Sequence, residues 1–174
     1  MTRYLVALGS NIAHARHGPP PHVVRAACAA LDAAPLYVVA IGPVITSTPL
    51  GPSRRRYANS AVIVETLLPP LALLSQLQAI ETAFGRIRRG QRWRARTLDL
   101  DIILWTGGAW SDDRLTIPHP EYAGRDFVLG PALRIAPDWR DPQTGLYVKQ
   151  THARLTRRAT MPKGPLPHAD ASGP

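Results

Sequence analysis

The chain lacks the residues from which disulfides and cysteine metal sites are built. Cys28 is the only cysteine among 174 residues, which excludes an intramolecular disulfide and a metal site made of cysteines. It lies in an alanine-rich stretch and is expected to be a small core residue. Long apolar runs are also missing. The run at 4–8 is too short for a signal peptide or a membrane span, so we expect a cytoplasmic protein with no membrane partner.

Acidic residues are scarce. Asp and Glu total 12 against 21 Lys and Arg, which gives a formal net charge of +9 and a pI of about 10.8. This balance favours anionic partners such as nucleotides, nucleic acid or acidic lipid. Much of the excess lies at 54–56, 86–96 and 154–158. A basic cleft of this kind suits a small polyanion as well as it suits nucleic acid.

Length and composition predict a single domain with a substantial core, because hydrophobic residues make up 45% of the chain. We place this domain at residues 1–159. From Thr160 onward Pro, Gly, Ala and Ser dominate and apolar content falls. Residues 160–174 are therefore predicted to form a disordered tail.

Hydrophobic periodicity and turn signals predict an α+β fold. The predicted strands lie at 4–8, 38–46, 59–66 and 98–105, and the predicted helices at 22–33 and 70–84. The order β-α-β-β-α-β is that of a ferredoxin-like sandwich, an antiparallel sheet backed by two helices. The predicted C-terminal additions are a turn and a short strand within 106–116, then helices at 126–135 and 148–158.

Two carboxylates stand two residues apart in the predicted strand at 98–105. Side chains at i and i+2 of a strand share a face, so Asp99 and Asp101 project together while Leu98 and Leu100 point into a core. Oxygen ligands of this kind select Mg²⁺ or Mn²⁺ over zinc, and two such ions form a clamp for phosphoryl chemistry. The alternative is a solvated strand face on which Arg96 is an ion-pair partner.

An arginine-rich segment at 85–96 leads directly into these acids, and it favours their interpretation as a metal site over a solvated strand face. It contains six arginines, two glycines and Trp93 in twelve residues. The planar guanidinium group matches phosphate oxygens, glycine makes a segment pliable, and tryptophan can cover a base. We expect this segment to close over a bound polyphosphate. A nucleic-acid contact loop or a solvated charge run is the alternative for an isolated arginine cluster.

Several short segments, taken in order, resemble the 6-hydroxymethyl-7,8-dihydropterin pyrophosphokinase family of folate biosynthesis, whose fold is the ferredoxin-like sandwich. The matching segments are Ala7–Asn11, Ser47–Pro52, Tyr57–Asn59, Ile80–Arg86, Trp93, Arg96–Ile102, Leu115–Pro120, Arg125–Leu129 and Ile135–Pro137. Each is weak to moderate alone, but their order and spacing are specific.

The resemblance implies transfer of the pyrophosphoryl group of ATP to the hydroxymethyl group of the reduced pterin, with release of AMP. It implies that Asp99 and Asp101 hold two Mg²⁺ ions and act with Arg86 and Arg96 as the catalytic set. The implied ATP-binding residues are Gln78, Glu81, Arg88, Trp93, Ile102, Arg114, Thr116, His119 and Arg125. The implied pterin-binding residues are Gly9, Thr48, Pro49, Leu50, Tyr57, Asn59 and Phe127. We expect a monomer that binds these two small molecules and no nucleic acid.

The sequence departs from the family pattern at Ala95, at 14–21 and at 54–56, which leaves room for a shifted substrate. Two alternatives therefore stay open. One is an RNA-recognition-like module, against which the acids and the count of only two Phe argue. The other is a metal-dependent phosphoryl or nucleotidyl transferase with a different acceptor. AMP release that depends on the added pterin distinguishes them.

The first prediction concerns the tail. A chain ending at Ala159 should match the full-length chain in AMP formation and in melting temperature, because the composition of 160–174 cannot bury enough apolar area to offset its ordering entropy. Thermal unfolding and a steady-state assay measure both. A melting temperature lower by many degrees would show that the tail docks on the domain.

Overall fold

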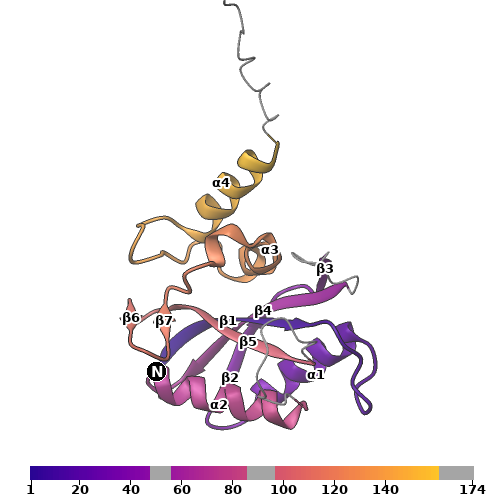
Figure 1. The fold of residues 1–174 in the computed structure, drawn as a ribbon. Helices are drawn as coiled ribbons and strands as arrows, with labels where there is room; N and C mark the ends of the chain where they lie inside the picture. Colours follow the sequence, from indigo (N-terminus) through magenta and orange to yellow (C-terminus); the bar gives the residue numbers. More distant parts are fainter. Residues whose placement is uncertain (48–55, 86–96, 161–174) are drawn as a thin grey trace, which may run out of the picture.

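A computed structural model of the chain describes residues 1–47, 56–85 and 97–160 (Figure 1). The strands are β1 (Thr2–Ser10), β2 (Tyr37–Ile41), β3 (Ile45–Ser47), β4 (Tyr57–Thr66), β5 (Asp99–Trp105), β6 (Trp110–Ser111) and β7 (Thr116–Ile117). The α-helices are α1 (Pro20–Leu31), α2 (Pro70–Ala83), α3 (Asp126–Ile135) and α4 (Val148–Thr160), and a 3₁₀ turn spans Tyr122–Gly124.

The main sheet has the ferredoxin-like arrangement that the sequence predicts. Its strands run in the order β2-β4-β1-β5, β3 also pairs with β4, and every pairing is antiparallel. Helices α1 and α2 lie on one side of the sheet, and α3 and α4 lie on the other (Figure 1). The predicted α+β sandwich with C-terminal additions is therefore confirmed.

Two hydrophobic cores result, one on each face of the sheet. Alternate residues of the strands pack under α1 and α2, with Val6, Leu8 and Leu100 among them. The other set, which includes Leu5 and Ile103, packs under α3 together with Val148 of α4. This two-sided burial explains why the strands read as nearly continuous apolar runs.

The predicted single strand at 38–46 is wrong. The chain forms β2 and β3 instead, and the two are separated by Gly42-Pro43-Val44. Pro43 has no N–H for a ladder bond. Gly42 passes so close to α3 that a Cβ there would lie 2.8 Å from the Pro131 carbonyl oxygen and 3.1 Å from that of Ala61. The edge strand is bent at this point by a tertiary contact.

Two smaller differences concern the C-terminal part. Residues 106–116 were predicted to contain one short strand, but β6 and β7 form a small hairpin. The last helix extends to Thr160, so this residue does not begin the tail. Residues 161–174 lie outside the described part of the chain.

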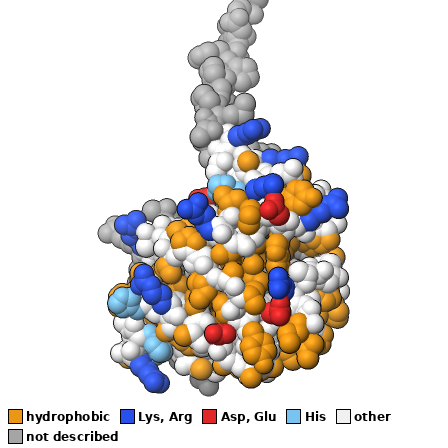
Figure 2. Space-filling model, turned by 180° about the vertical axis from the view of Figure 1, so that it is seen from behind, with side chains coloured by type: hydrophobic (Ala, Val, Ile, Leu, Met, Phe, Trp, Pro, Cys, Tyr) orange, Lys and Arg blue, Asp and Glu red, His pale blue; other side chains and the backbone are white. Residues whose placement is uncertain are grey.

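Strand β2 forms an edge of the sheet and carries exposed apolar side chains. Tyr37, Val39 and Ile41 are 52%, 47% and 56% exposed. In the view from behind, hydrophobic side chains cover much of the visible surface of the domain (Figure 2). A register shift lies between Val38 and Ala40, and Asp32 accepts a hydrogen bond from the Val38 N–H at 3.0 Å. A bulge and a side-chain cap are devices that protect an edge from pairing with another chain.

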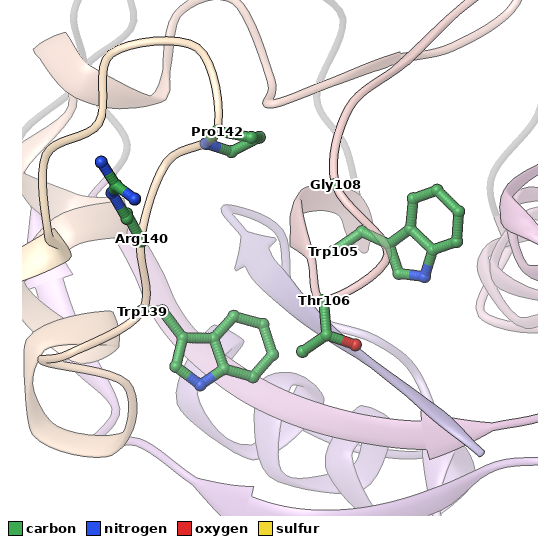
Figure 3. Close-up of a pocket in the computed structure, with 6 residues that line it drawn as sticks. All are labelled: Trp105, Thr106, Gly108, Trp139, Arg140 and Pro142. Atoms are coloured by element: carbon green, nitrogen blue, oxygen red, sulfur yellow. The ribbon is translucent and has the colours of Figure 1, made fainter.

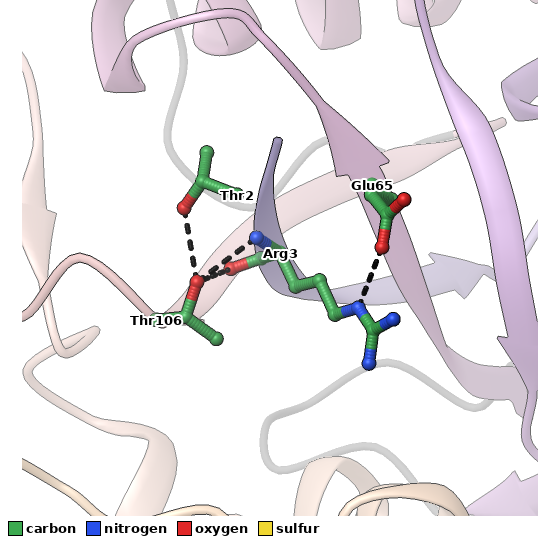
Figure 4. A network of polar contacts seen from close by, with 4 residues as sticks. All are labelled: Thr2, Arg3, Glu65 and Thr106. Atoms are coloured by element: carbon green, nitrogen blue, oxygen red, sulfur yellow. Dashed lines mark hydrogen bonds and ion pairs between the residues drawn. The ribbon is translucent and has the colours of Figure 1, made fainter.

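A polar network fastens the end of β5 to the start of β1 (Figure 4). The Thr106 hydroxyl lies 2.9 Å from the Thr2 hydroxyl and accepts a 2.9 Å hydrogen bond from the Arg3 N–H. Arg3 Nε lies 2.7 Å from Glu65 Oε2 on β4. These contacts fix the register of β4, β1 and β5 at the end remote from Asp99. Among the described helices, none has the length and apolarity to cross a membrane.

We predict that Gly42→Ala destabilises the fold by about 1–3 kcal/mol, because the new methyl group must push two backbone carbonyls apart. For a domain of this size that is a fall of roughly 2–10 °C in melting temperature. Gly124→Ala is the matched control, since a Cβ at Gly124 would meet nothing within 4 Å. Equal melting temperatures for the two variants would contradict the close approach of α3.

Candidate active site

The two aspartates begin β5 and share one face of the sheet. Asp99 and Asp101 are partly exposed, whereas Leu98, Leu100 and Ile102 are buried in the core under α1 and α2. The strand rise separates the two aspartate Cα atoms by about 7 Å. The predicted alternation of carboxylates and core residues is therefore confirmed.

Residues from three adjacent strands form one row across the sheet at the level of Asp99. Gly9 of β1 pairs with Asp99 of β5 on one side and with Asn59 of β4 on the other. Strands lie about 4.8 Å apart, so the Asn59 and Asp99 Cα atoms are about 10 Å apart. The next row on the same face is Ala61, Ala7 and Asp101. The small residues Gly9 and Ala7 of β1 thus lie between the Asn59 amide and the two carboxylates.

Asn59 is fixed in place from two sides. Its side chain is 4% exposed, and its amide nitrogen donates a 2.8 Å hydrogen bond to the Ser47 hydroxyl of β3. A Cβ on Gly9 would lie 3.4 Å from Asn59 Oδ1. The amide oxygen therefore lies directly beside Gly9, at a spacing that would be an ordinary contact for a Cβ. The contribution of Ser47 was not predicted, although Ser47 opens the Ser47–Pro52 motif.

Glu81 holds the strand that carries the acids. It is 2% exposed on α2, and its Oε1 accepts a 2.9 Å hydrogen bond from the backbone N–H of Leu100, the residue between the two aspartates. The sequence pointed to a nucleotide contact for Glu81. That expectation stays a prediction, and the observed hydrogen bond shows in addition that Glu81 holds β5 between the two aspartates. Gln78 lies one turn earlier on α2 and is partly buried, and Ile102 is 3% exposed in the adjacent core.

His119 is tied to the same strand. Its backbone N–H donates a 3.0 Å hydrogen bond to the carbonyl of Ile103, two residues after Asp101. Its Nδ1 accepts a 3.1 Å hydrogen bond from the Glu121 N–H. Because an accepting Nδ1 carries no proton, Nε2 carries it and is the donor of the ring. Thr116 precedes this segment on β7 and is partly buried.

Arg114 lies exposed in the turn between β6 and β7. Asp112 shapes this turn by accepting hydrogen bonds from the Arg114 and Leu115 N–H groups at 2.7 and 2.9 Å and from Trp110 Nε1 at 2.9 Å. The pKa of Asp112 is lowered, first by the Arg114 N–H and then by Trp110. Asp112 thus fixes the turn that carries Arg114, and no pattern in the sequence indicated this contribution.

An aromatic and cationic pair comes from the start of α3. The Arg125 guanidinium lies 5.8 Å from the centre of the Phe127 ring, and Arg125 also forms an ion pair with Glu121. Phe127 packs against the core under α3, on the face of the sheet to which Asp99 and Asn59 belong. Tyr57 begins β4 opposite Ser47 and is partly exposed. The described residues thus offer aromatic surface, an amide and a guanidinium on one face.

Seven of the predicted site residues lie outside the described part of the chain. They are Thr48, Pro49, Leu50, Arg86, Arg88, Trp93 and Arg96. The expected closure of 85–96 over a polyphosphate also falls outside the described residues, except for Gly85.

The donor set fits magnesium better than a softer metal. Within 1–47, 56–85 and 97–160, no three His, Cys, Asp or Glu side chains gather into a metal site. Two carboxylates alone leave most of an octahedral shell to water and phosphate oxygens, which is the usual arrangement for Mg²⁺ bound with a nucleotide. The residues therefore fit the magnesium ions that the family resemblance implies.

A separate cavity of about 530 Å³ lies at the other end of β5 (Figure 3). It is lined by Trp105, Thr106, Gly108, Trp139, Arg140 and Pro142. Asp99 and Trp105 are the two ends of a seven-residue strand, which spans about 20 Å. This cavity is therefore distinct from the end of β5 that carries the acids.

Comparisons with known proteins identify the family. The model of the 7,8-dihydro-6-hydroxymethylpterin-pyrophosphokinase (HPPK) family matches residues 5–137. The 2-amino-4-hydroxy-6-hydroxymethyldihydropteridine pyrophosphokinase of Synechocystis sp. is 39% identical over 162 residues, which cover 92% of this chain and 80% of that protein. The Pseudomonas aeruginosa protein of the same name is 43% identical over 142 residues, covering 80% and 84%. The chain therefore belongs to the HPPK family.

Solved structures show the same fold. Plasmodium falciparum HPPK-DHPS crystallised with pteroate aligns with a TM-score of 0.68 at 11% identity, over 91% of this chain and 43% of that one. An HPPK-DHPS in complex with substrates aligns with a TM-score of 0.70, over 90% of this chain and 45% of that one. The chain spans less than half of these longer proteins, and at such low identity the likeness shows the fold alone.

We predict that Glu81→Leu destabilises the chain more than Glu81→Gln does. Leucine leaves the buried Leu100 N–H without its acceptor, which costs about 1–3 kcal/mol, whereas glutamine keeps an oxygen that can accept the bond. Urea unfolding measures the difference. A displaced β5 should also raise the Mg²⁺ concentration needed for half-maximal activity. Equal stability of the two variants would contradict the positioning role.

Proposed function

We propose that the chain transfers the β,γ-pyrophosphoryl group of ATP to the hydroxymethyl oxygen of 6-hydroxymethyl-7,8-dihydropterin, in folate biosynthesis. The hydroxyl oxygen attacks the β-phosphorus, the bond from that phosphorus to the α,β-bridging oxygen breaks, and AMP leaves. The hydroxyl proton is released. Family membership at about 40% identity supports this activity. ATP is the co-substrate.

The observation that carries the assignment of the site is the row Asn59–Gly9–Asp99. A flat heterocycle with ring donors and acceptors can pair with the Asn59 amide and lie against the Phe127 and Tyr57 rings. A triphosphate can reach Asp99 through metal ions on the other side of Gly9. The estimated separation of about 10 Å between the Asn59 and Asp99 Cα atoms suits a reaction between two neighbouring ligands.

We assign Asp99 and Asp101 to two Mg²⁺ ions, which when bound would neutralise phosphate charge and align the transferring group. In this proposal His119 donates from Nε2–H to phosphate oxygens, and Arg125 supplies a guanidinium group for the same purpose. Ser47 orients Asn59, and Glu81 orients β5. The roles of Thr48–Leu50 and of the arginines at 86–96 rest on the family resemblance.

We further propose a monomeric, cytoplasmic enzyme with no nucleic-acid partner. The bulge and the Asp32 cap on β2 support a monomer because they disfavour edge-to-edge pairing. ATP as a co-substrate supports the cytoplasm. Without bound metal, the carboxylates on β5 would repel a nucleic-acid backbone.

The activity is tested directly by incubating the full-length chain with ATP and Mg²⁺, with and without 6-hydroxymethyl-7,8-dihydropterin. We expect AMP and the pterin diphosphate in equal amounts, and no AMP when the pterin is left out. AMP or ADP formed at the same rate without pterin would point to a transferase with another acceptor.

We predict that Asp99→Asn or Asp101→Asn lowers kcat by at least about a thousandfold, because metal-based charge stabilisation amounts to several kcal/mol. The change keeps the side-chain shape, so the melting temperature should stay within a few degrees. Asp138→Asn is the matched control: Asp138 forms an exposed ion pair with Lys149, and such pairs contribute little. Near wild-type turnover of either active-site variant in Mg²⁺ would refute the metal assignment.

A further inference from the structure

A tight turn at 14–18, in the segment where the sequence departs from the family pattern, is organised by a histidine. The His14 and Gly18 backbones exchange two hydrogen bonds of 2.8 Å, and Gly18 has a φ of +80°, which favours glycine. Within the turn, His14 Nδ1 accepts hydrogen bonds from the N–H groups of Arg16 at 3.0 Å and His17 at 3.2 Å. Asp and Asn more often do this work, in Asx turns.

The turn requires a particular protonation state of His14. An imidazole nitrogen accepts hydrogen bonds only when it carries no proton, and the imidazolium ion carries one on both nitrogens. A proton on Nδ1 would therefore point at the N–H groups of Arg16 and His17, and both hydrogen bonds would be lost. The turn is therefore compatible only with the neutral form of the ring, and histidine is the side chain that most readily changes charge near neutral pH.

The turn contacts the end of α2, the helix whose Glu81 side chain is hydrogen-bonded to the strand that carries the acids. The His17 ring stacks on Phe84 at 4.8 Å with an 18° angle between the planes, and the His14 ring lies 6.0 Å from Phe84. Phe84 is 6% exposed and ends α2 through a hydrogen bond to Ile80. One turn earlier on α2, Glu81 accepts the Leu100 N–H between the aspartates.

The charges around the turn favour opening in acid. Among the described residues, the titratable and charged groups that reach the turn are Arg16 and His17 within it and His22 from α1. Helix α2 contributes the uncharged Phe84. The pKa of His17 is lowered, first by partial burial and then by His14 and Arg16. The folded state thus favours neutral His17, and the stability it contributes is present above about pH 6.5 and is lost as the pH falls below that value.

We propose that His14 is a pH-sensitive positioning residue: when neutral it closes the 14–18 turn, which stacks His17 on Phe84 and holds the end of α2 where Glu81 can orient β5. Protonation opens the turn and releases this support. His14 touches neither substrate in this account. The kinetic readout rests on the proposed function, whereas the structural readout does not.

His14→Asn is the decisive variant, because the asparagine oxygen can accept the same backbone N–H groups and does not titrate. We would measure kcat/KM for ATP from pH 5.5 to 8 for the wild type, His14→Asn and the control His152→Gln, which removes a histidine of α4. In parallel, NMR would follow the His14 ring carbon and the His17–Phe84 ring contacts over the same range, without substrate.

At pH 8 all three proteins should be similar. As the pH falls, the ratio of His14→Asn to wild-type activity should rise on the order of tenfold, the equivalent of one net hydrogen bond. The His17–Phe84 contacts should weaken in the wild type as His14 titrates and persist in His14→Asn. His152→Gln should follow the wild type.

Parallel activity profiles for the wild type and His14→Asn would overturn the positioning role, even if the turn opens. Ring contacts that survive complete protonation of His14 would overturn the switch itself. Absence of pterin-dependent AMP formation by the wild type at pH 8 would instead refute the proposed function and leave the NMR test of the turn intact. Should His14→Asn prove poorly folded, the wild-type NMR titration alone decides the switch.

Discussion

The structure depends on the antiparallel pairing of β1 with β4 on one side and β5 on the other. This pairing puts Asn59, Gly9 and Asp99 in one row although they are far apart in the sequence. Because side chains alternate along each strand, the register also decides which face receives them. A shift of one residue in either pairing would send Asp99 or Asn59 into the core under α1 and α2.

Hydrogen bonds from neighbouring elements hold the Asn59–Gly9–Asp99 row and its surroundings in place. Ser47 holds the Asn59 amide, Glu81 holds the strand between the aspartates, and the Ile103 carbonyl holds His119. At the other end of the strands, the Thr2–Thr106 contact locks the register. The reactive groups thus lie on rigid strands, and their supports come from neighbouring elements. Phosphoryl transfer needs this kind of fixed geometry more than it needs a covalent nucleophile.

Much of the architecture could be predicted from the sequence, because periodicity and β-branched runs report burial directly. The β-α-β-β-α-β order and the helix at 126–135 follow from such local patterns. The break at Gly42 could not be predicted, since it comes from the close approach of α3, a tertiary contact without a local signature beyond the Gly-Pro pair.

The candidate site, like the fold, could be predicted from the sequence only in part. The shared face of Asp99 and Asp101 follows from strand geometry alone. In two places a side chain accepts a backbone N–H: Glu81 accepts that of Leu100, and His14 accepts that of Arg16. Which backbone N–H groups have no backbone partner depends on the tertiary fold, so these bonds have no local signature in the sequence. The order of the family motifs indicated which residues matter, but only the register shows how those on β1, β4 and β5 meet.

The most direct test of this account is paramagnetic broadening by Mn²⁺ in place of Mg²⁺, with a non-hydrolysable ATP analogue bound. The Gly9 backbone amide and the Asn59 side-chain amide should broaden strongly, since they lie within about 10 Å of Asp99, whereas the Arg3 amide, six residues along β1, should stay sharper. Asp99→Asn should abolish the effect. Equal broadening at Arg3 and Gly9, or broadening centred on the Thr106 end of β5, would contradict a metal site on the Asn59–Gly9–Asp99 row.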